Sequence, residues 1–176
     1  MDRRTAKDLM IPLDEYPHVP YWFTLCQAMA EFEKAEFDVG GRKSLPRVVL
    51  VFNEAYELLG MVRRRDILRG LEPESLSHIL RPGLFGSKTP AGAHETLSKK
   101  IIEKLQRPVS DIMTPIRESV DHADDLVKVM LKMVEHNLSF VPVMKDKEVI
   151  GVVRTVELIG ELAQLCHLDK TDKREK

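Results

Sequence analysis

Two short blocks of the sequence place an arginine and an acid at matching positions. The first block is Gly60-Met61-Val62-Arg63-Arg64-Arg65-Asp66, and the second block is Gly151-Val152-Val153-Arg154-Thr155-Val156-Glu157. A guanidinium group is a fixed fork of donors that suits phosphate oxygens, and a carboxylate can accept two hydrogen bonds at once. Taken alone, an arginine run is typical of a solvated turn. A lone acid such as Asp66 is typical of a first helical turn, where it is worth about 0.3–1 kcal/mol against the helix dipole.

The other reactive side chains are scattered. The histidines and cysteines form no His-x-x-x-His or Cys-x-x-Cys spacing, so structural or surface roles are favoured for them and we expect no metal. No Gly-x-Ser-x-Gly, P-loop or Gly-x-Gly-x-x-Gly motif occurs. Neither Cys26 nor Cys166 has a neighbouring residue that would lower its pKa. We therefore expect no catalytic residue and no cofactor, and a protein that is not an enzyme.

The amino-acid composition further limits the class of protein. A chain of 176 residues suits one full-sized domain or two small ones, and 43% hydrophobic with 31% charged residues is ordinary for a globular protein. The 27 basic and 28 acidic residues leave a net charge of -1, so no overall field attracts nucleic acid. No apolar run approaches the length of a membrane span, and the first residues lack a signal-peptide pattern. We expect a cytoplasmic protein with reduced thiols that binds neither nucleic acid nor membrane.

An internal repeat organises the chain. Asp8-Leu9-Met10-Ile11-Pro12-Leu13 matches Asp111-Ile112-Met113-Thr114-Pro115-Ile116 at an offset of 103, and the first block, with the two residues before it, matches the second block at an offset of 91. Two matches in the same order are much less probable by chance than one. The difference between the offsets places about a dozen extra residues in the first copy. We place them at 34–46, where Gly40-Gly41-Arg42-Lys43-Ser44 is typical of a loop.

Both copies predict the element order β-α-β-β-α. In the second copy, residues 109–113 form one helical turn, which Thr114-Pro115 closes, and residues 116–120 form a strand. Next comes a helix that runs to about His136, with Asp121, Asp124 and Asp125 supplying its N-cap and first-turn negative charge. A hairpin of 140–144 and 149–153 and a helix capped by Thr155 and ending near Cys166 follow. In the first copy the corresponding ranges are 13–18 (extended), 21–36 (a helix introduced by Pro20), 48–52 and 58–62 (a hairpin) and 65–71 (a helix).

The segments outside the repeat have their own predictions. Residues 81–93 hold three glycines and two prolines, so they are predicted as a linker or surface loop. Residues 94–106 have apolar residues at helical spacing, so they are predicted as a helix packed beside the second copy. Residues 169–176 are almost wholly charged and are predicted as a frayed tail.

This pattern resembles the cystathionine β-synthase (CBS) domain family, through the turn ending Met-x-Pro, the order β-α-β-β-α and the Gly-h-h-x-x-x-Asp block, where h is apolar. Two copies resemble a tandem CBS pair. The resemblance implies an α+β fold of two β-α-β-β-α CBS-type units packed as a pseudo-twofold pair, with two clefts that bind adenosine-containing ligands such as AMP, ATP or S-adenosylmethionine. The expected domains are CBS unit 1 at 3–72 with the insertion at about 34–46, a linker with a helix at 73–106, CBS unit 2 at 107–168 and the tail at 169–176.

The resemblance also suggests site residues. The family's block is Gly-h-h-Thr/Ser-x-x-Asp, in which the hydroxyl and the helix N-terminus receive phosphate and the aspartate holds the ribose. Here Arg63 and Arg154 stand where the hydroxyl belongs, and Glu157 replaces the aspartate. We therefore prefer the first block, with Asp66 on ribose and Arg63 on a ligand richer in phosphate. The other expected ligand-binding residues are Gly60, Met61, Val62, Arg64, the apolar walls Met10, Ile11, Pro12, Met113, Thr114, Pro115 and Ile116, and Arg154, Thr155 and Glu157 of the second block.

The apolar surfaces of two predicted helices suggest that the protein forms an oligomer. The predicted helices at 21–36 and 121–136 are apolar over more than the roughly 100° stripe that one core-facing side needs. Either a homodimer forms through these helices, or the helix at 94–106 or the other copy covers the second face; we favour the homodimer. The expected function is a stand-alone regulatory module that senses energy or metabolite levels by binding an adenine nucleotide, with a possible unknown protein target. The alternatives are a scaffold that binds no ligand, and a small enzyme with an unrecognised site.

Overall fold

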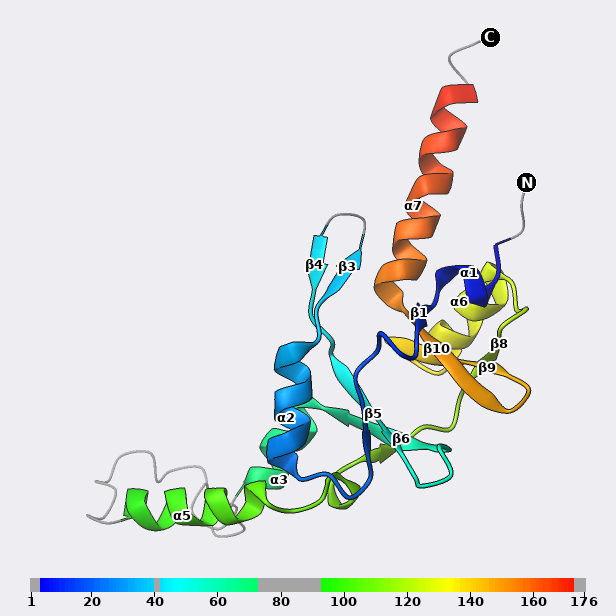
Figure 1. Cartoon of the computed structure of the whole chain (residues 1–176). Coiled ribbons are helices and arrows are strands. Elements are labelled where there is room, and N and C mark those ends of the chain that lie inside the picture. The colour runs from blue at the N-terminus through cyan, green and yellow to red at the C-terminus, as the bar shows by residue number, and fades with distance from the viewer. Residues whose placement is uncertain (1–3, 40–41, 73–92, 173–176) are drawn as a thin grey trace. The chain divides into compact units, whose positions relative to one another are not determined.

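The structure, a computed structural model, describes residues 4–39, 42–72 and 93–172 (Figure 1). The described chain divides into two compact units. The first-block unit consists of residues 17–37 and 45–115 and contains the first block. The second-block unit consists of residues up to 16, 38–44 and from 116 onward, and contains the second block. The predicted linker, residues 81–93, lies outside the described residues except for its last residue, and so do residues 173–176 of the predicted tail.

The first-block unit is built on a four-stranded sheet of order β2-β5-β6-β7. Its strands are β2 (His18–Pro20), β5 (Val48–Phe52), β6 (Leu58–Arg63) and β7 (Thr114–Pro115). Strand β2 runs parallel to β5, whereas β5–β6 and β6–β7 are antiparallel. All five residues of β5 are buried, as the continuous β-branched run predicts. The predicted hairpin of 48–52 and 58–62 is confirmed.

The second-block unit repeats this topology in a sheet of order β8-β9-β10-β1. Its strands are β8 (Val120–Asp121), β9 (Phe140–Lys145), β10 (Glu148–Arg154) and β1 (Ile11–Pro12). Strand β8 is parallel to β9, and the other pairs are antiparallel. The hairpin prediction is again confirmed. The predicted strand at 116–120 is wrong, because only Val120 of that range pairs in the sheet, and Thr114-Pro115 forms the separate strand β7.

The two Met-x-Pro segments are exchanged between the repeats. Strand β1 precedes the first hairpin in the chain but pairs with β10 of the second, whereas β7 precedes the second hairpin but pairs with β6 of the first. Each sheet therefore holds a parallel strand and a hairpin from one copy and a two-residue strand from the other. The compact units do not follow the limits of the sequence repeat, and the domain boundaries at 3–72 and 107–168 stay a prediction about the repeat.

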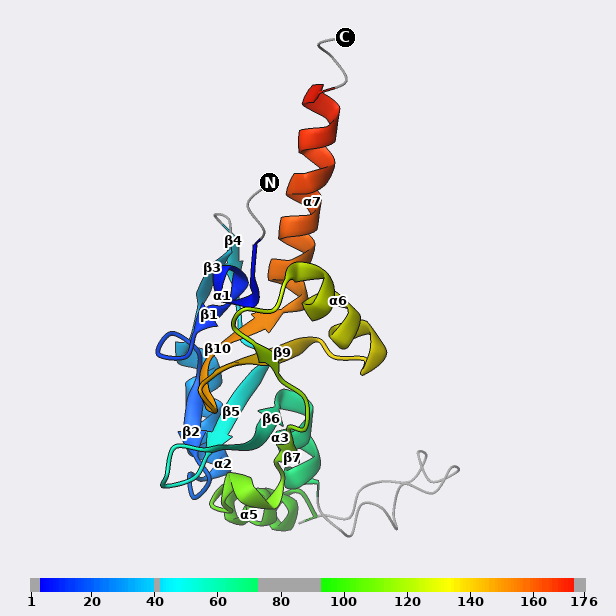
Figure 2. The same ribbon diagram turned by 90° about the vertical axis from the view of Figure 1, so that its right-hand side faces the viewer.

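Helices supply the remaining core of each unit. The first-block unit has α2 (Leu25–Lys34), α3 (Arg64–Leu71), α5 (Ala93–Leu105) and the short 3₁₀ helix η1 (Val109–Asp111). The second-block unit has α1 (Ala6–Leu9), α6 (Leu126–Glu135) and α7 (Thr155–Asp172), and Figure 2 shows α6 and α7 beside β9 and β10. Each unit buries its own cluster, with Val49, Val51 and Val62 in one and Val141, Val143 and Val153 in the other.

Two helix predictions need correction. Helix α2 begins at Leu25 and not at Tyr21, because Thr24 caps it: the Thr24 hydroxyl accepts from Gln27 N at 3.2 Å, and the Gln27 side chain accepts from Thr24 N at 2.9 Å. Helix α6 begins after Asp125, one of the three acids expected at its start, and the Asp125 side chain accepts from Lys128 N. The predicted helix at 94–106 is confirmed as α5, but it packs against α2 and α3 of the first-block unit, not beside the second copy.

The insertion is not a loop as predicted. Strands β3 (Phe37–Val39) and β4 (Arg42–Ser44) pair as a separate two-stranded sheet (Figure 1). The last helix, α7, starts at Thr155 and extends to Asp172, six residues beyond the predicted end, so residues 169–172 of the predicted tail are helical. Among the helices described, none combines the length and the apolar composition that a membrane span requires.

Candidate functional site

The first block ends in a buried ion pair at the junction of β6 and α3. Asp66 is 5% exposed and lies in the first turn of α3. One of its carboxylate oxygens accepts from the backbone N of Arg63 at 3.0 Å and from Nε at 2.8 Å, and the other accepts from Nη2 at 3.1 Å. This charge-assisted hydrogen bonding to Asp66 raises the pKa of Arg63. Asp66 therefore caps α3 and orients the guanidinium group.

Arg63 also contacts strand β7 and reaches solvent. Its Nη2 atom donates to the Thr114 hydroxyl at 3.2 Å, and its side chain is 35% exposed. Arg63, Asp66 and Thr114 come from β6, α3 and β7. The structure thus brings together three residues that were predicted to bind a ligand, and the Arg63 side chain is partly exposed.

Positive charge gathers around this ion pair. Arg64 and Arg65 are exposed at the start of α3, and the guanidinium carbon of Arg64 lies 5.2 Å from the ring centre of Phe32. Arg47 is also exposed and directly precedes Val48, which pairs with Arg63 across β5 and β6. Sequence analysis missed Arg47, although its place one residue before the hairpin strand could have been a signal. The backbone positions of these arginines therefore fall near the junction of β5, β6 and α3.

Strand β7 closely covers the glycine of the first block. Gly60 pairs with Pro115, and a Cβ atom built on Gly60 would lie 2.6 Å from the Thr114 carbonyl oxygen. Only a residue without a side chain allows this approach. Of the two apolar residues that follow, Met61 is partly exposed and Val62 is fully buried in the core.

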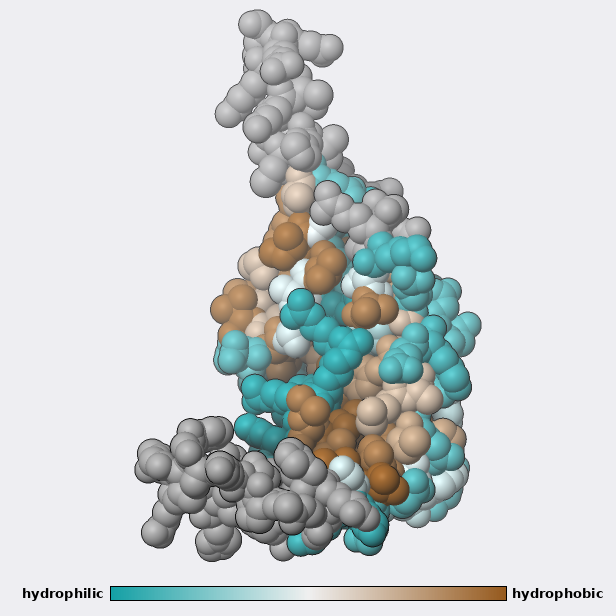
Figure 3. Space-filling model, turned by 90° about the vertical axis from the view of Figure 1, so that its left-hand side faces the viewer, coloured by the Kyte–Doolittle hydropathy of each residue, from teal (hydrophilic) through white to brown (hydrophobic). Residues whose placement is uncertain are grey.

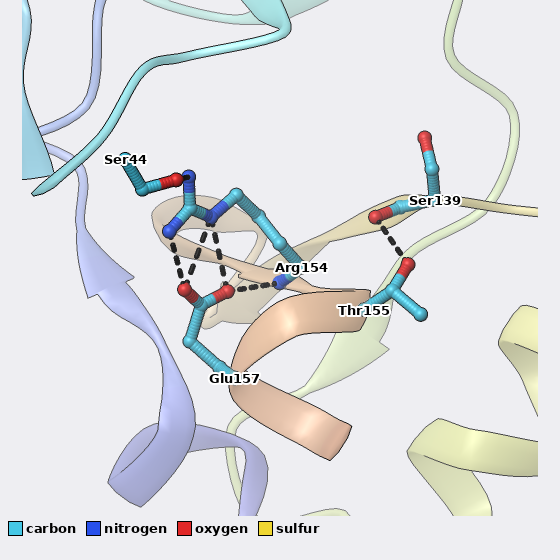
Figure 4. A network of polar contacts seen from close by, with 5 residues as sticks. All are labelled: Ser44, Ser139, Arg154, Thr155 and Glu157. Atoms are coloured by element: carbon cyan, nitrogen blue, oxygen red, sulfur yellow. Dashed lines mark hydrogen bonds and ion pairs between the residues drawn. The ribbon is translucent and has the colours of Figure 1, made fainter. Parts of the chain in front are cut away.

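The second block has the same ion pair in a more enclosed setting (Figure 4). A Glu157 oxygen accepts from the backbone N of Arg154 at 3.0 Å, and Nε and Nη2 of Arg154 donate to the same carboxylate. Nη1 donates to the Ser44 hydroxyl of β4 at 3.3 Å. The side chains of Arg154 and Glu157 are only 7% and 11% exposed. Glu157, not Thr155, satisfies the helix start.

Thr155 and the buried Tyr16 complete this second network. Thr155 is the first residue of α7, so the prediction that it caps the helix is wrong; its hydroxyl donates to the Ser139 carbonyl oxygen at 2.8 Å. Tyr16 is 2% exposed. Burial raises the pKa of Tyr16, the positive charge of Arg154 opposes that shift and the negative charge of Glu157 adds to it.

The apolar wall residues are divided between the two sheets. Met113, Thr114 and Pro115 belong with the first block, whereas Met10, Ile11 and Pro12 belong with the second. Ile11 and Pro12 pair with Val152 and Gly151, and a Cβ atom on Gly151 would lie 2.6 Å from the Ile11 carbonyl oxygen. Ile116 falls in the second-block unit. Among the described residues, no three His, Cys, Asp or Glu side chains gather as metal ligands would.

Part of the sequence and the overall fold are similar to those of known proteins. A model of the CBS domain family matches residues 109–164. No curated protein sequence matches the chain. Among solved structures, CBSX2 in complex with AMP has a TM-score of 0.60 at 18% identity, with 92% of this chain and 97% of that chain covered.

Two further structures have the same fold. A CBS domain-containing protein of unknown function from Kribbella flavida has a TM-score of 0.64 at 16% identity, with 91% and 98% of the two chains covered. A putative acetoin utilization protein (AcuB) from Vibrio cholerae has a TM-score of 0.63 at 18% identity, with 96% and 97% covered. The fold is mixed α+β with two four-stranded sheets, and it matches tandem CBS-pair structures. Residues 109–164 thus match a CBS domain, and the chain as a whole shares the fold of tandem CBS-pair structures.

Proposed function

We propose that this protein is a regulatory module that binds an adenine nucleotide at the first block, with Arg63 on phosphate and Asp66 on the ribose hydroxyls. The observation that carries the proposal is the constellation of Arg63, Asp66 and Thr114, in which a buried carboxylate orients a partly exposed guanidinium group. The structure of CBSX2, which is a complex with AMP, supports the ligand class by its similar fold.

The charges favour a ligand with several phosphates. Arg64, Arg65 and Arg47 follow or pair beside Arg63 in the backbone and are exposed, so they could add contacts to a ligand with more than one phosphate. Arginine binds phosphate through parallel hydrogen bonds. The first turn of α3 adds backbone N–H groups and the positive end of the helix dipole. We therefore expect ATP to bind more tightly than AMP.

Binding would exchange the partners of Arg63. Without ligand, the Nε and Nη2 atoms of Arg63 occupy both oxygens of Asp66. A phosphate that draws the guanidinium group outward frees these oxygens to accept from the two ribose hydroxyls, while the backbone N of Arg63 still donates to Asp66. A ligand shifts an equilibrium only through its different affinities for two states. The change of Arg63 partners would make the affinity for the nucleotide differ between the two states. A protein target would then bind one of these states in preference to the other.

Calorimetry tests the proposal with AMP, ADP, ATP and S-adenosylmethionine. The variants are Arg63→Met and Asp66→Asn, and the control is Arg69→Met, which removes an exposed arginine from the same helix. Each hydrogen bond to a charged group is worth about 1.5–3 kcal/mol, so Arg63→Met should weaken ATP binding by roughly 10- to 100-fold. The control should bind ATP like the wild type.

The outcomes separate the alternatives. No heat and no thermal shift with any of the four ligands at millimolar concentration would contradict nucleotide binding and favour the scaffold. Tightest binding of S-adenosylmethionine, which has no phosphate, would contradict the role of Arg63. Turnover of a nucleotide by the wild-type protein would favour the enzyme alternative.

The proposed module assembles as a homodimer through its helices. Three exposed apolar residues, Val127, Leu131 and Val134, follow i, i+4, i+7 spacing on α6, and Val156 and Ile159 are exposed on α7. Figure 3 draws the side opposite to the one in Figure 2, and other exposed apolar residues appear there as brown patches. Grouped apolar residues of this kind mark interaction surfaces. Light scattering should show a dimer that Leu131→Glu converts to a monomer and that Glu135→Gln, on the same helix, does not.

A further inference from the structure

We propose that the insertion hairpin of β3 and β4 seals the second block, so that Arg154 and Glu157 form a closed structural ion pair and the first block alone is open to a nucleotide. The seal itself is argued from the contacts of this chain. Its consequence for ligand stoichiometry rests on the proposed function. The two parts can be tested separately.

The two blocks differ in what covers them and not in their own pairing. Arg63 and Arg154 each bind a carboxylate three residues later, through the same side-chain atoms and the same backbone N–H. Yet the Arg63 side chain is 35% exposed and the Arg154 side chain 7%. Arg154 donates to Ser44 of β4, whereas Arg63 donates to Thr114 of β7. The enclosure of Arg154 therefore coincides with a contact from the insertion.

Charge also separates the blocks. Thr155 and Val156 stand where the first block has Arg64 and Arg65. The residues of the second block therefore supply one cation for one carboxylate, whereas those of the first block supply three cations for one carboxylate. The second block therefore has less positive charge with which to attract an anion.

The second block is covered because the first copy of the sequence repeat is longer than the second copy. The connection between α2 and β5 runs from residue 35 to residue 47 and contains β3 and β4, whereas the connection between α6 and β9 spans only residues 136–139. The additional residues of the first copy place Ser44 within the second-block unit. The second copy has no matching insertion to place over the first block. The two blocks thus have the same arginine–acid pairing, but only the second block is covered by an insertion.

Arginine labelling with phenylglyoxal tests the seal on the full chain without any ligand. Peptide mass spectrometry after cleavage at residues other than arginine gives the labelling rate of each site. Arg63 is a matched internal control, because it has the same acid pairing. Labelling of a sealed side chain requires local opening, so we expect Arg154 to react at least about 10-fold more slowly than Arg63. Equal rates in the folded wild-type protein would overturn the seal.

Two variants identify the insertion as the cause. Ser44→Lys places a cation beside Arg154 and should raise the labelling of Arg154 toward that of Arg63. Leu45→Lys, an equal change at the exposed neighbouring residue, should leave Arg154 protected. Circular dichroism is the check that both variants fold. If Ser44→Lys is folded and Arg154 stays as slow as in the wild type, the insertion is not the seal.

Adding ATP then distinguishes the seal from the proposed function. We expect ATP to slow the labelling of Arg63 and not of Arg154, with one ATP bound per chain by calorimetry. Two ATP per chain, or protection of Arg154 by ATP, would overturn the inference that the second block is closed. If no nucleotide protects Arg63 while Arg154 is slow and Ser44→Lys releases it, the seal stands and the proposed function fails.

Discussion

Gly60 lies opposite Pro115 in the antiparallel pairing of β6 with β7, and Gly151 lies opposite Pro12 in the pairing of β10 with β1. Each glycine of a duplicated block thus receives the proline of a Met-x-Pro segment from the other repeat. This relationship explains why both motifs appear twice. Because glycine has no side chain, the backbone of β7 or β1, which is distant in the sequence, can lie close to it.

Replacing either glycine by alanine should destabilise the protein. A Cβ atom on Gly60 would lie 2.6 Å from the Thr114 carbonyl oxygen, and one on Gly151 would lie 2.6 Å from the Ile11 carbonyl oxygen. Backbone atoms can relieve such contacts only by moving the short strand, and overpacking of this kind costs about 1–3 kcal/mol. Urea unfolding of Gly60→Ala and Gly151→Ala should show this loss.

Gly160→Ala is the matched control. Gly160 lies within α7, and a Cβ atom there would meet nothing within 4 Å. Alanine should therefore stabilise the helix by about 0.5–1 kcal/mol. If Gly60→Ala were as stable as Gly160→Ala, the tight approach of β7 would be wrong.

Removing one partner of the second-block ion pair should destabilise the protein more than removing both partners. Arg154→Met leaves the nearly buried carboxylate of Glu157 without its partner, and breaking a buried pair in this way costs about 3–5 kcal/mol. Removing both charges in Arg154→Met/Glu157→Leu should restore much of the loss. A double-mutant cycle by chemical denaturation measures the coupling, and a double variant less stable than Arg154→Met would contradict this account.

Tyr16 should make the protein sensitive to alkali. Burial holds the pKa of Tyr16 above its ordinary value of 10.0, so the unfolded chain releases this proton first as the pH rises. The contribution is present below pH 10 and is lost above it, at up to about 1.4 kcal/mol per pH unit. Tyr16→Phe should reduce the slope of unfolding free energy against pH above 10. An unchanged slope in that variant would show that Tyr16 ionises equally well in the folded chain.

The cap of α2 should respond to substitution as its hydrogen bonds require. Thr24→Ala removes the acceptor for Gln27 N and should cost about 1 kcal/mol in thermal or urea unfolding. Thr24→Asp keeps an acceptor at the same position and should retain most of the stability. Equal stability of the alanine and aspartate variants would mean that the helix does not depend on this cap.

Local patterns account for the elements that were predicted well. The β-branched runs at 48–52 and 140–144 can bury a continuous face in a strand, so both hairpins could be placed from residue types alone. Helix α2 starts later than Pro20 predicts, because Thr24 and Gln27 form a capping box that fixes its first turn. The insertion was misread as a loop, although a Gly-Gly pair between short segments is also a hairpin signal.

Sequence by itself determined the duplication, the two Gly-h-h-Arg blocks and the acid three residues after each arginine, because helix starts and hairpins depend on near neighbours. Only the tertiary structure decided which sheet each Met-x-Pro segment joins, and which arginine is covered. Strands of two residues have too few hydrogen bonds to choose a partner locally, so long-range packing places β1 and β7. The cover of Arg154 likewise comes from Ser44, 110 residues earlier in the chain, and no local pattern connects the two.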